Sequence, residues 1–438
     1  FAGTDVGVFY RDNTLDRWLP FNNNLPSCIV MDLEINDSTN RIYAATFGRG
    51  IFESDISCPF STEPLVISDN TTWTRDTVMD RSIVVDSLVT FTISCRIAFP
   101  YQAKIFVKQG GILVVNGGLL TNACFSNWQG IEVWGHEDLE QMPLSNQGRV
   151  YFLNGAILEK ARIGVTTCRK DTAGRVIWNT TGGVITADSA VFRNNYKAIE
   201  FLSYPHHQSS NFNRTLFQTT VDIIDGFTGH PSDFVSMFDV KGVRFSGCTF
   251  QNSRVLPNTA PGPHRGRGIY SINSQFYVND WCNNYNPPCP PAGSVPCTFR
   301  GLHYGIRQLN YTPVANVSIN RAQFIDNSRG VYLSAADYSE ITSCEFKIPK
   351  SSGDPGTSSL DTCYGLYLGA CTGYHVEDNH FFVEGNTLLT SGQQFRIREI
   401  GLVVDNSGGE PNEIYRNRFD SLDLAINAQR CNRNDEEK

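Results

Sequence analysis

The residues best suited to chemistry lie in the segment FDVKGVRF, which places Asp239, Lys241 and Arg244 close together. Arg265 and Arg267 arrive with the next loop. A basic side chain beside a carboxylate could abstract a proton from an acidic sugar whose own charge the arginines neutralise. The alternative is a row of alternating charges on the solvated side of a strand, which is common and contributes little energy. We favour the solvated row and keep these five residues as the catalytic candidates.

Four residues at equivalent positions could bind a ligand without reacting with it. Each stands two residues after a glycine, and they are Tyr270, Arg307, Tyr332 and Tyr367. Val403 occupies the next such position. In stacked strands these side chains would form an outward column, and aromatic rings with an arginine between them offer a flat surface to sugar rings. A tyrosine ladder that only stabilises the outside of a sheet is the alternative, and the sequence leaves both open.

The chain contains 13 cysteines, none of them in a Cys-x-x-Cys pair. The proline-rich segment WCNNYNPPCPPAGSVPC holds Cys282, Cys289 and Cys297 at spacings too wide for a zinc site without histidine partners. We therefore predict disulfides there and an oxidising compartment outside the cytoplasm. His206 and His207 are adjacent in a loop with no obvious acidic partner nearby, so no metal ligands are assigned.

The elements that position these residues recur through most of the chain. The repeat reads apolar-x-apolar, two residues, a small residue or Asn, one residue and Phe, followed later by Gly or Ala before a second apolar-x-apolar. Examples are VRFSGCTF at 243–250, VSINRAQF at 317–324 and YHVEDNHF at 374–381. The period of two indicates strands. Coils of roughly 22 to 36 residues without a helical pattern predict an all-β parallel β-helix.

Stacked coils place equivalent side chains about 4.8 Å apart, one coil above the next. We therefore predict an interior aromatic stack formed by Phe250, Phe324, Phe346, Phe381 and Phe419. The residues two positions before each Phe are predicted to form a second interior row, here called the ladder. They are Cys248, Ala322, Cys344, Asn379 and Asn417. An inward Asn can hydrogen-bond the backbone of the adjacent turn.

Residues 103–135, AKIFVKQGGILVVNGGLLTNACFSNWQGIEVWG, read as short strands separated by paired glycines. They resemble the first coils of secreted right-handed β-helices of the pectate-lyase-like superfamily, and the resemblance extends over residues 64–438. Large surface proteins of Bacteroidota carry a similar W-x-G-I-x-V-x-G motif, which is present here as Trp128, Gly130, Ile131, Val133 and Gly135. The resemblance implies a right-handed parallel β-helix that continues beyond residue 438.

The first 57 residues have a different pattern. They resemble the last blade of a sialidase-type or xyloglucanase-like β-propeller through Ala2-Gly3-Thr4, Gly7-Val8-Phe9, Trp18, Leu25-Pro26 and residues 45–52. One blade cannot bury its own faces, and about four or more blades close a propeller. The resemblance therefore implies that residues 1–57 are a fragment of a larger domain, joined by a linker at 58–63 to the β-helix at 64–438.

Composition and motifs restrict the chemistry. The net charge is −8 and no basic patch indicates a nucleic acid partner. No run approaches the roughly 18 apolar residues of a membrane span. Hydrolases of the superfamily use Gly-His-Gly and Arg-Ile-Lys motifs, whereas this chain has no Gly-His-Gly and its RIREI at 396–400 lacks the lysine. Lyases of the superfamily use Ca²⁺, but no calcium-binding repeat is present, so we expect no cofactor.

The resemblance to Bacteroidota surface proteins implies export by the type IX route and a place on the outer cell surface. We therefore predict a non-catalytic adhesin or structural scaffold within a larger surface assembly. Its partners would be glycans or other surface and secretion proteins, bound through loops and the outward aromatic face. The alternative is a polysaccharide lyase or glycoside hydrolase that acts on an acidic glycan.

Overall fold

The structure is a computed structural model, and it describes residues 1–11, 18–22, 25–36, 38–39, 41–56, 60–123, 127–223, 229–256, 262–282, 293–311, 315–349, 362–384 and 399–432. These residues form strands and turns, with no α-helix among them. Three short 3-10 helices are present in the same ranges: η1 (Leu144–Asn146), η2 (Trp178–Thr180) and η3 (Gly262–Arg265). No helix in the described part of the chain is long and apolar enough to cross a bilayer.

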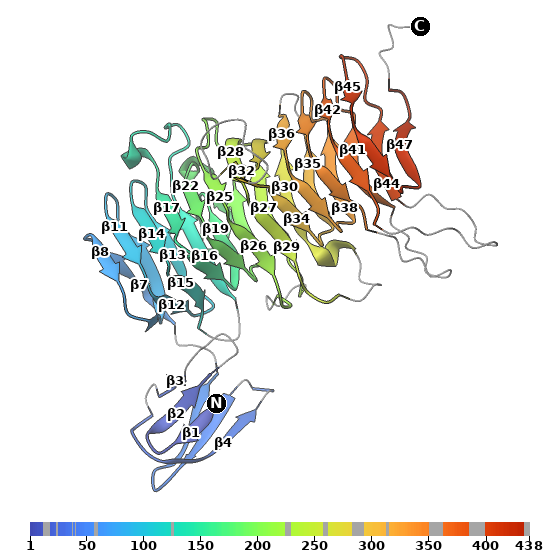
Figure 1. The fold of residues 1–438 in the computed structure, drawn as a ribbon. Coiled ribbons are helices and arrows are strands. Elements are labelled where there is room, and N and C mark those ends of the chain that lie inside the picture. Colours follow the sequence, from blue (N-terminus) through green and yellow to red (C-terminus); the bar gives the residue numbers. More distant parts are fainter. Residues whose placement is uncertain are drawn as a thin grey trace, which may run out of the picture.

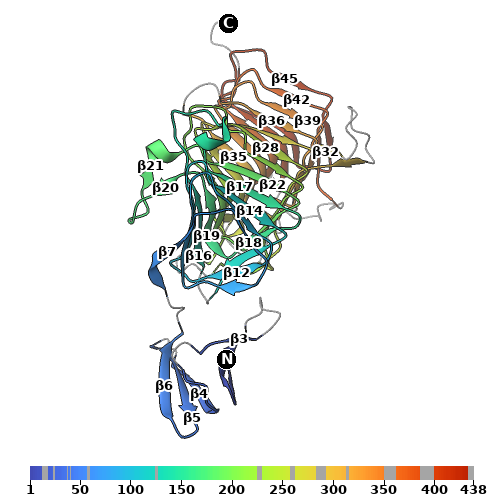
Figure 2. The same ribbon diagram turned by 90° about the vertical axis from the view of Figure 1, so that its left-hand side faces the viewer.

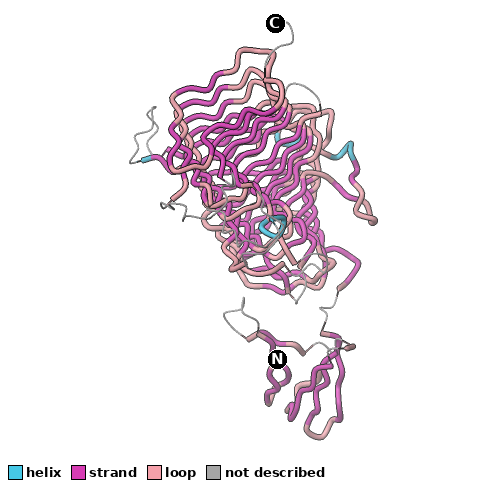
Figure 3. The backbone as a smooth tube through the Cα atoms, turned by 90° about the vertical axis from the view of Figure 1, so that its right-hand side faces the viewer, coloured by secondary structure: helices cyan, strands magenta, loops and turns pink. Residues whose placement is uncertain are grey.

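Three long parallel sheets form most of the molecule, and each coil adds one strand to each sheet in turn (Figures 1 and 3). Sheet 1 has 13 strands: β7 (Ser61–Ile67), β10 (Arg81–Val85), β13 (Lys104–Val107), β16 (Trp128–Val133), β19 (Ala161–Thr166), β24 (Lys197–Phe201), β27 (Asp233–Phe238), β30 (Arg267–Ile272), β35 (Tyr304–Leu309), β38 (Arg329–Ser334), β41 (Cys363–Gly369), β44 (Glu399–Asp405) and β47 (Leu424–Gln429).

The other two sheets have 12 strands each. Sheet 2 contains β8 (Thr71–Trp73), β11 (Thr90–Ile93), β14 (Ile112–Asn116), β17 (Arg149–Leu153), β22 (Val184–Asp188), β25 (Asn211–Asn213), β28 (Lys241–Ser246), β31 (Gln275–Asn279), β36 (Val317–Asn320), β39 (Glu340–Thr342), β42 (His375–Glu377) and β45 (Glu413–Tyr415). Sheet 3 contains β9 (Thr77–Val78), β12 (Arg96–Phe99), β15 (Leu119–Asn122), β18 (Ile157–Glu159), β23 (Val191–Arg193), β26 (Leu216–Thr219), β29 (Thr249–Asn252), β34 (Thr298–Arg300), β37 (Gln323–Ile325), β40 (Glu345–Lys347), β43 (His380–Phe382) and β46 (Arg418–Asp420). The chain is therefore an all-β right-handed parallel β-helix, as the repeat predicts.

The predicted interior aromatic stack is confirmed and is longer than predicted. Successive rings lie 4.5 to 5.1 Å apart and within 10° of parallel. The rings belong to Phe192, Phe217, Phe250, Phe299, Phe324, Phe346, Phe381 and Phe419. The coil spacing explains this geometry, because stacked strands repeat the same side-chain position at each step.

The glycines of the repeat are explained by close packing against this stack. A Cβ placed on Gly365 would lie 2.6 Å from Cδ1 of Phe381 and 2.8 Å from the carbonyl oxygen of Gly401. The same pair of obstacles, a ring and a carbonyl of the next coil, surrounds Gly305 and Gly401. Any side chain at these positions would force the Phe ring or the sheet to move.

The predicted ladder of small and polar residues two positions before each Phe is also confirmed. The side chain of Asn379 donates to the carbonyl of Ile341, and its oxygen accepts from the amide of Cys344, both at 2.9 Å. Asn417 repeats the pattern by accepting the amide of Asn379 at 3.0 Å. The Asn side chains thus satisfy backbone groups of the neighbouring coil.

The cysteine prediction is partly wrong. Cys282 is disulfide-bonded, and Cys289 lies outside the described residues. Cys297, however, is a buried free thiol inside the β-helix. It precedes Phe299 by two residues, its thiol donates to the carbonyl of Asn279 at 3.2 Å, and it therefore belongs to the interior ladder.

The buried thiols form a wider group within the described chain. Free and buried cysteines there include Cys28, Cys95, Cys168, Cys248, Cys297, Cys344 and Cys371. Burial raises the pKa of Cys344 and that of Cys371 to about 12 each. These residues act as small apolar side chains of the core, so the β-helix is held mainly by packing and its hydrogen-bond ladders.

Residues before the β-helix form a separate small unit with its own core (Figure 1). Its two three-stranded antiparallel sheets contain β1 (Ala2–Thr4), β2 (Gly7–Tyr10), β3 (Leu19–Pro20), β4 (Val30–Asn36), β5 (Arg41–Thr46) and β6 (Gly50–Asp55). The hydroxyl of Tyr10 donates to the carbonyl of Ala123 in the β-helix at 3.0 Å. That this unit is a propeller blade ending at residue 57 stays a prediction; the first strand of sheet 1, β7, begins at Ser61.

Candidate functional site

The predicted outward column exists as a row across sheet 1. The register pairs Tyr270 with Arg307, Arg307 with Tyr332, Tyr332 with Tyr367, and Tyr367 with Val403. The four predicted ligand-binding residues are half-buried, because each is flanked by its neighbours in the row. The Tyr332 and Tyr367 rings stack at 4.9 Å with 21° between their planes.

A second row runs beside the first, and sequence reasoning missed it. The register joins Arg267 to Tyr304, Tyr304 to Arg329, and Arg329 to Tyr364. Each residue directly precedes a glycine of the repeat, where strict alternation would point it into the core. The glycine is not paired with the neighbouring strand, and this interrupts the alternation of sides. As a result, the residue before the glycine and the residue two positions after it, such as Arg267 and Tyr270, lie on the same outer side of the sheet. The sequence did contain a sign of this second row, because Arg-Gly and Tyr-Gly pairs alternate from one coil to the next.

The two rows form one surface, here called the Tyr/Arg face. It consists of Arg267, Tyr270, Tyr304, Arg307, Arg329, Tyr332, Tyr364 and Tyr367, of which Tyr304 and Tyr364 are each only 7% exposed. The guanidinium carbon of Arg307 lies 5.3 to 6.0 Å from the ring centres of Tyr270, Tyr304 and Tyr332. Arg267 lies closer to Tyr270, at 4.1 Å. Such cation–π contacts hold the arginines against the rings.

Charge is distributed unevenly over the Tyr/Arg face. Arg267 forms an ion pair with the buried carboxylate of Asp233. Arg307 has a buried Nε for which the described residues provide no hydrogen-bond partner. Burial, followed by the neighbouring phenol of Tyr304, raises the pKa of Tyr332 above its ordinary value. Tyr332 therefore remains neutral at physiological pH.

Toward the N-terminal coils, the row that contains Tyr270 continues with polar residues, some of which form partly buried ion pairs. Glu132, Thr166, Glu200 and Ser236 follow one another in register and end beside Tyr270. Glu200 accepts from Lys170 at 2.5 Å and Lys197 at 2.8 Å. Lys170 belongs to the hairpin β20 (Arg169–Lys170) and β21 (Val176–Ile177), which stands out beside sheet 1 (Figure 2).

The predicted catalytic residues do not form one site. Asp239 sits in the turn after β27 and accepts from the hydroxyl of Ser203 at 2.8 Å. Lys241 and Arg244 lie on β28 of sheet 2, where Arg244 covers the ring of Tyr277 at 4.9 Å. Arg265 ends η3, and Arg267 lies on sheet 1 within the Tyr/Arg face. The five residues are thus divided between two sheets, a turn and a 3-10 helix.

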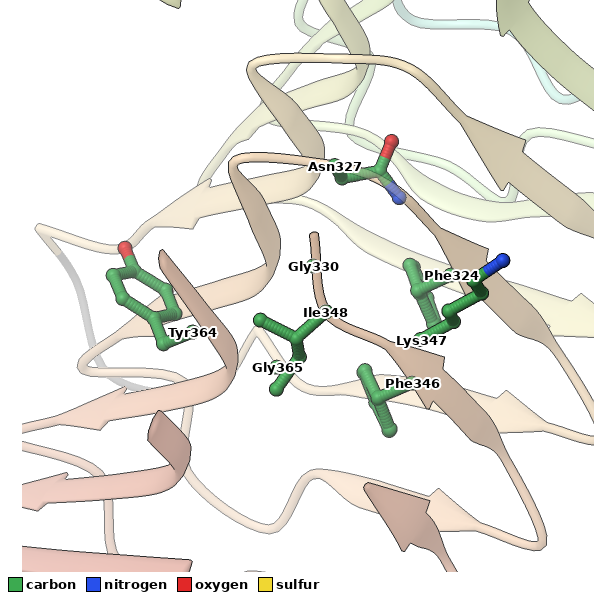
Figure 4. A pocket seen from close by; sticks show the side chains of 8 residues that line it. All are labelled: Phe324, Asn327, Gly330, Phe346, Lys347, Ile348, Tyr364 and Gly365. Atoms are coloured by element: carbon green, nitrogen blue, oxygen red, sulfur yellow. The ribbon is translucent and has the colours of Figure 1, made fainter. Parts of the chain in front are cut away.

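A metal centre does not accompany these residues in the described part of the chain. In the described ranges no group of three or more His, Cys, Asp or Glu side chains could hold a metal ion. A space of about 140 Å³ lies between the Phe stack and sheet 1. Figure 4 shows the residues that line it, which include Phe346, Lys347, Ile348 and Tyr364. This space is too narrow for a water molecule, so it is a packing gap. The candidate site is the Tyr/Arg face, because it groups aromatic and positively charged side chains on one side of sheet 1.

No family model matches the chain, and no curated protein matches it. Among solved structures, a point mutant of the periplasmic alginate epimerase AlgG is 9% identical, with 82% of this chain and 78% of that chain covered and a TM-score of 0.44. The Streptococcus pneumoniae surface protein and adhesin PfbA is 11% identical over 84% and 91%, with a TM-score of 0.34. The Yersinia enterocolitica family 28 exopolygalacturonase is 7% identical over 89% and 83%, with a TM-score of 0.20. These values support no statement about what this chain binds or catalyses.

Proposed function

We propose that the protein is a non-catalytic, carbohydrate-binding adhesin that presents the Tyr/Arg face to a glycan outside the cell. The observation that carries this proposal is the stacked pair Tyr332 and Tyr367. It continues a row in which Arg307 lies among three tyrosine rings. Sugar rings pack their C–H faces on aromatic rings, and arginine supplies hydrogen bonds to their hydroxyl or acidic groups.

The place of this protein at the cell surface, its export by the type IX route and its membership of a larger surface assembly belong to the same proposal. They are supported by the resemblance of residues 103–135 to secreted Bacteroidota β-helices and by the disulfide at Cys282. A rigid rod of stacked coils suits an adhesin because it holds a binding face in a fixed shape.

The proposal is tested by screening the purified protein against an array of acidic and neutral polysaccharides while measuring product release in the same wells. We expect binding to at least one glycan and no release of oligosaccharide. Release of product would identify an enzyme instead. Absence of binding to every glycan would reject the carbohydrate-binding function and leave a scaffold for other proteins.

A further inference from the structure

Two large aromatic side chains come together at the surface beside the Tyr/Arg face. Trp178 is 49% exposed and Phe238 is 38% exposed, and their ring centres lie 6.2 Å apart with 58° between the planes. Trp178 begins η2, directly after β21 of the projecting hairpin, whereas Phe238 ends β27 in sheet 1 (Figure 2). Paired exposed aromatic rings contributed by two segments are typical of a binding surface.

The segment that carries Trp178 is anchored to its surroundings. The hydroxyl of Thr180 accepts from the amide of Arg169 at 2.9 Å, and the carbonyl of Thr180 accepts from the amide of Gly135 at 2.8 Å. Lys170 ties the same hairpin to Glu200 on sheet 1. A ring that is fixed before the ligand arrives loses little conformational entropy on binding.

The pair lies on the same side of sheet 1 as the Tyr/Arg face. In register, Ser236 pairs with Tyr270, and Phe238 pairs with Ile272, which is followed by Leu309. This apolar row runs directly beside the row that contains Tyr270 and Tyr367. Phe238 lies on β27 and Tyr367 lies on β41, four strands further along sheet 1. At about 4.8 Å per strand, the two residues are separated by roughly 19 Å along the sheet, so one sugar ring could not contact both.

We infer that Trp178 and Phe238 form a second sugar-stacking subsite, and that the ligand is an extended polysaccharide chain bound along its length across the coils. The inference rests on the proposed function and specifies its ligand. A chain that reaches both subsites gains the second contact without paying again for association, so affinity rises with chain length. A single terminal sugar would engage only one subsite.

The test uses disaccharides to octasaccharides prepared from xylan, laminarin, polygalacturonate and hyaluronan, with binding measured by calorimetry. For any polysaccharide whose oligosaccharides bind, the affinity of the wild-type protein should rise with the length of the oligosaccharide and then level off. In Trp178→Ala, affinity for the long members should fall by roughly 2- to 10-fold, while affinity for the shortest bound member is unchanged. Trp178→Phe keeps an aromatic ring and should retain most of the gain.

The matched control is Trp18→Ala, because Trp18 is 47% exposed but lies in the N-terminal unit. It should bind every length as the wild type does. If Trp178→Ala binds all lengths like the wild type, and Tyr332→Ala/Tyr367→Ala abolishes binding, the second subsite is rejected and the proposed function stands. If no saccharide binds to the wild-type protein, the proposed function itself fails.

Discussion

Tyr367 belongs to the Tyr/Arg face and also forms a hydrogen bond with a buried carboxylate. Its hydroxyl donates to Oδ2 of Asp405 at 2.5 Å, and this carboxylate is only 5% exposed. Burial, together with the hydrogen bond to Asp405, raises the pKa of Tyr367 well above its ordinary value. Tyr367 therefore remains a neutral donor that satisfies a buried charge while its ring stacks on Tyr332.

Tyr367→Phe should separate these two roles. Removing the hydroxyl takes a donor from a buried carboxylate, so the free energy of unfolding should fall by about 1–3 kcal/mol in urea titrations. Glycan binding should change little, because the ring remains. Tyr338→Phe, at a side chain that is 57% exposed, is the control and should have no effect on stability. Equal stability of the wild type and Tyr367→Phe would show that the Asp405 contact contributes nothing.

At the scale of the elements, a partly buried ion pair between Lys170 and Glu200 joins the β20–β21 hairpin to sheet 1. Glu200 is 13% exposed and contacts Lys170 and Lys197. Burial alone would raise its pKa, but the two lysines outweigh burial and lower the pKa to about 2. Because Trp178 follows this hairpin, the ion pairs also hold the proposed second subsite in place.

The pH dependence of stability follows from this lowered pKa. The unfolded chain has an ordinary Glu pKa of about 4.3, so it binds more protons than the folded chain at lower pH. The contribution of Glu200 is present above about pH 4.3 and is lost as the pH falls toward 2, by up to about 3 kcal/mol. Urea unfolding between pH 6 and pH 2 should show a smaller loss in Glu200→Gln than in the wild type or in the exposed control Glu410→Gln. Identical slopes for all three proteins would contradict this assignment.

The two faces of a single strand give a sharper test of the core. On β43 the ring of Phe381 lies in the interior stack, whereas that of the next residue, Phe382, is only partly buried. Phe381→Ala should lower the free energy of unfolding by about 3–5 kcal/mol, because it leaves a cavity between two rings. Phe382→Ala should lower the free energy of unfolding by much less. Comparable losses for the two variants would mean that the stack is not the main support of these coils.

At the scale of the whole molecule, the repeat in the sequence was enough to predict the β-helix. The Phe stack and the Asn ladder were predictable because each coil repeats the same local environment. Cys297 was mistaken for a disulfide partner because its proline-rich neighbourhood outweighed the Cys-Thr-Phe spacing that it shares with Cys248. The spacing was the better guide, since it reflects the coil position.

Only half of the candidate site could be predicted, because strict alternation along the strand holds for one of its two rows and fails for the other. Tyr270, Arg307, Tyr332 and Tyr367 follow strict alternation, so the sequence placed them correctly on the outer face. Arg267, Tyr304, Arg329 and Tyr364 precede a glycine that the strand register skips, and alternation fails there. Trp178 belongs to a hairpin insertion outside the repeat, and its meeting with Phe238 depends on tertiary packing.

The most direct test of the account compares the dissociation constant of one bound glycan for the wild type, Tyr332→Ala/Tyr367→Ala and Tyr277→Ala. Tyr277 is the matched control, because it also lies under an arginine but on sheet 2. We predict that the double variant, folded as judged by circular dichroism, binds at least about fivefold more weakly, while Tyr277→Ala binds normally. Unchanged binding by the folded double variant would contradict the account and leave these tyrosines as supports of the sheet alone.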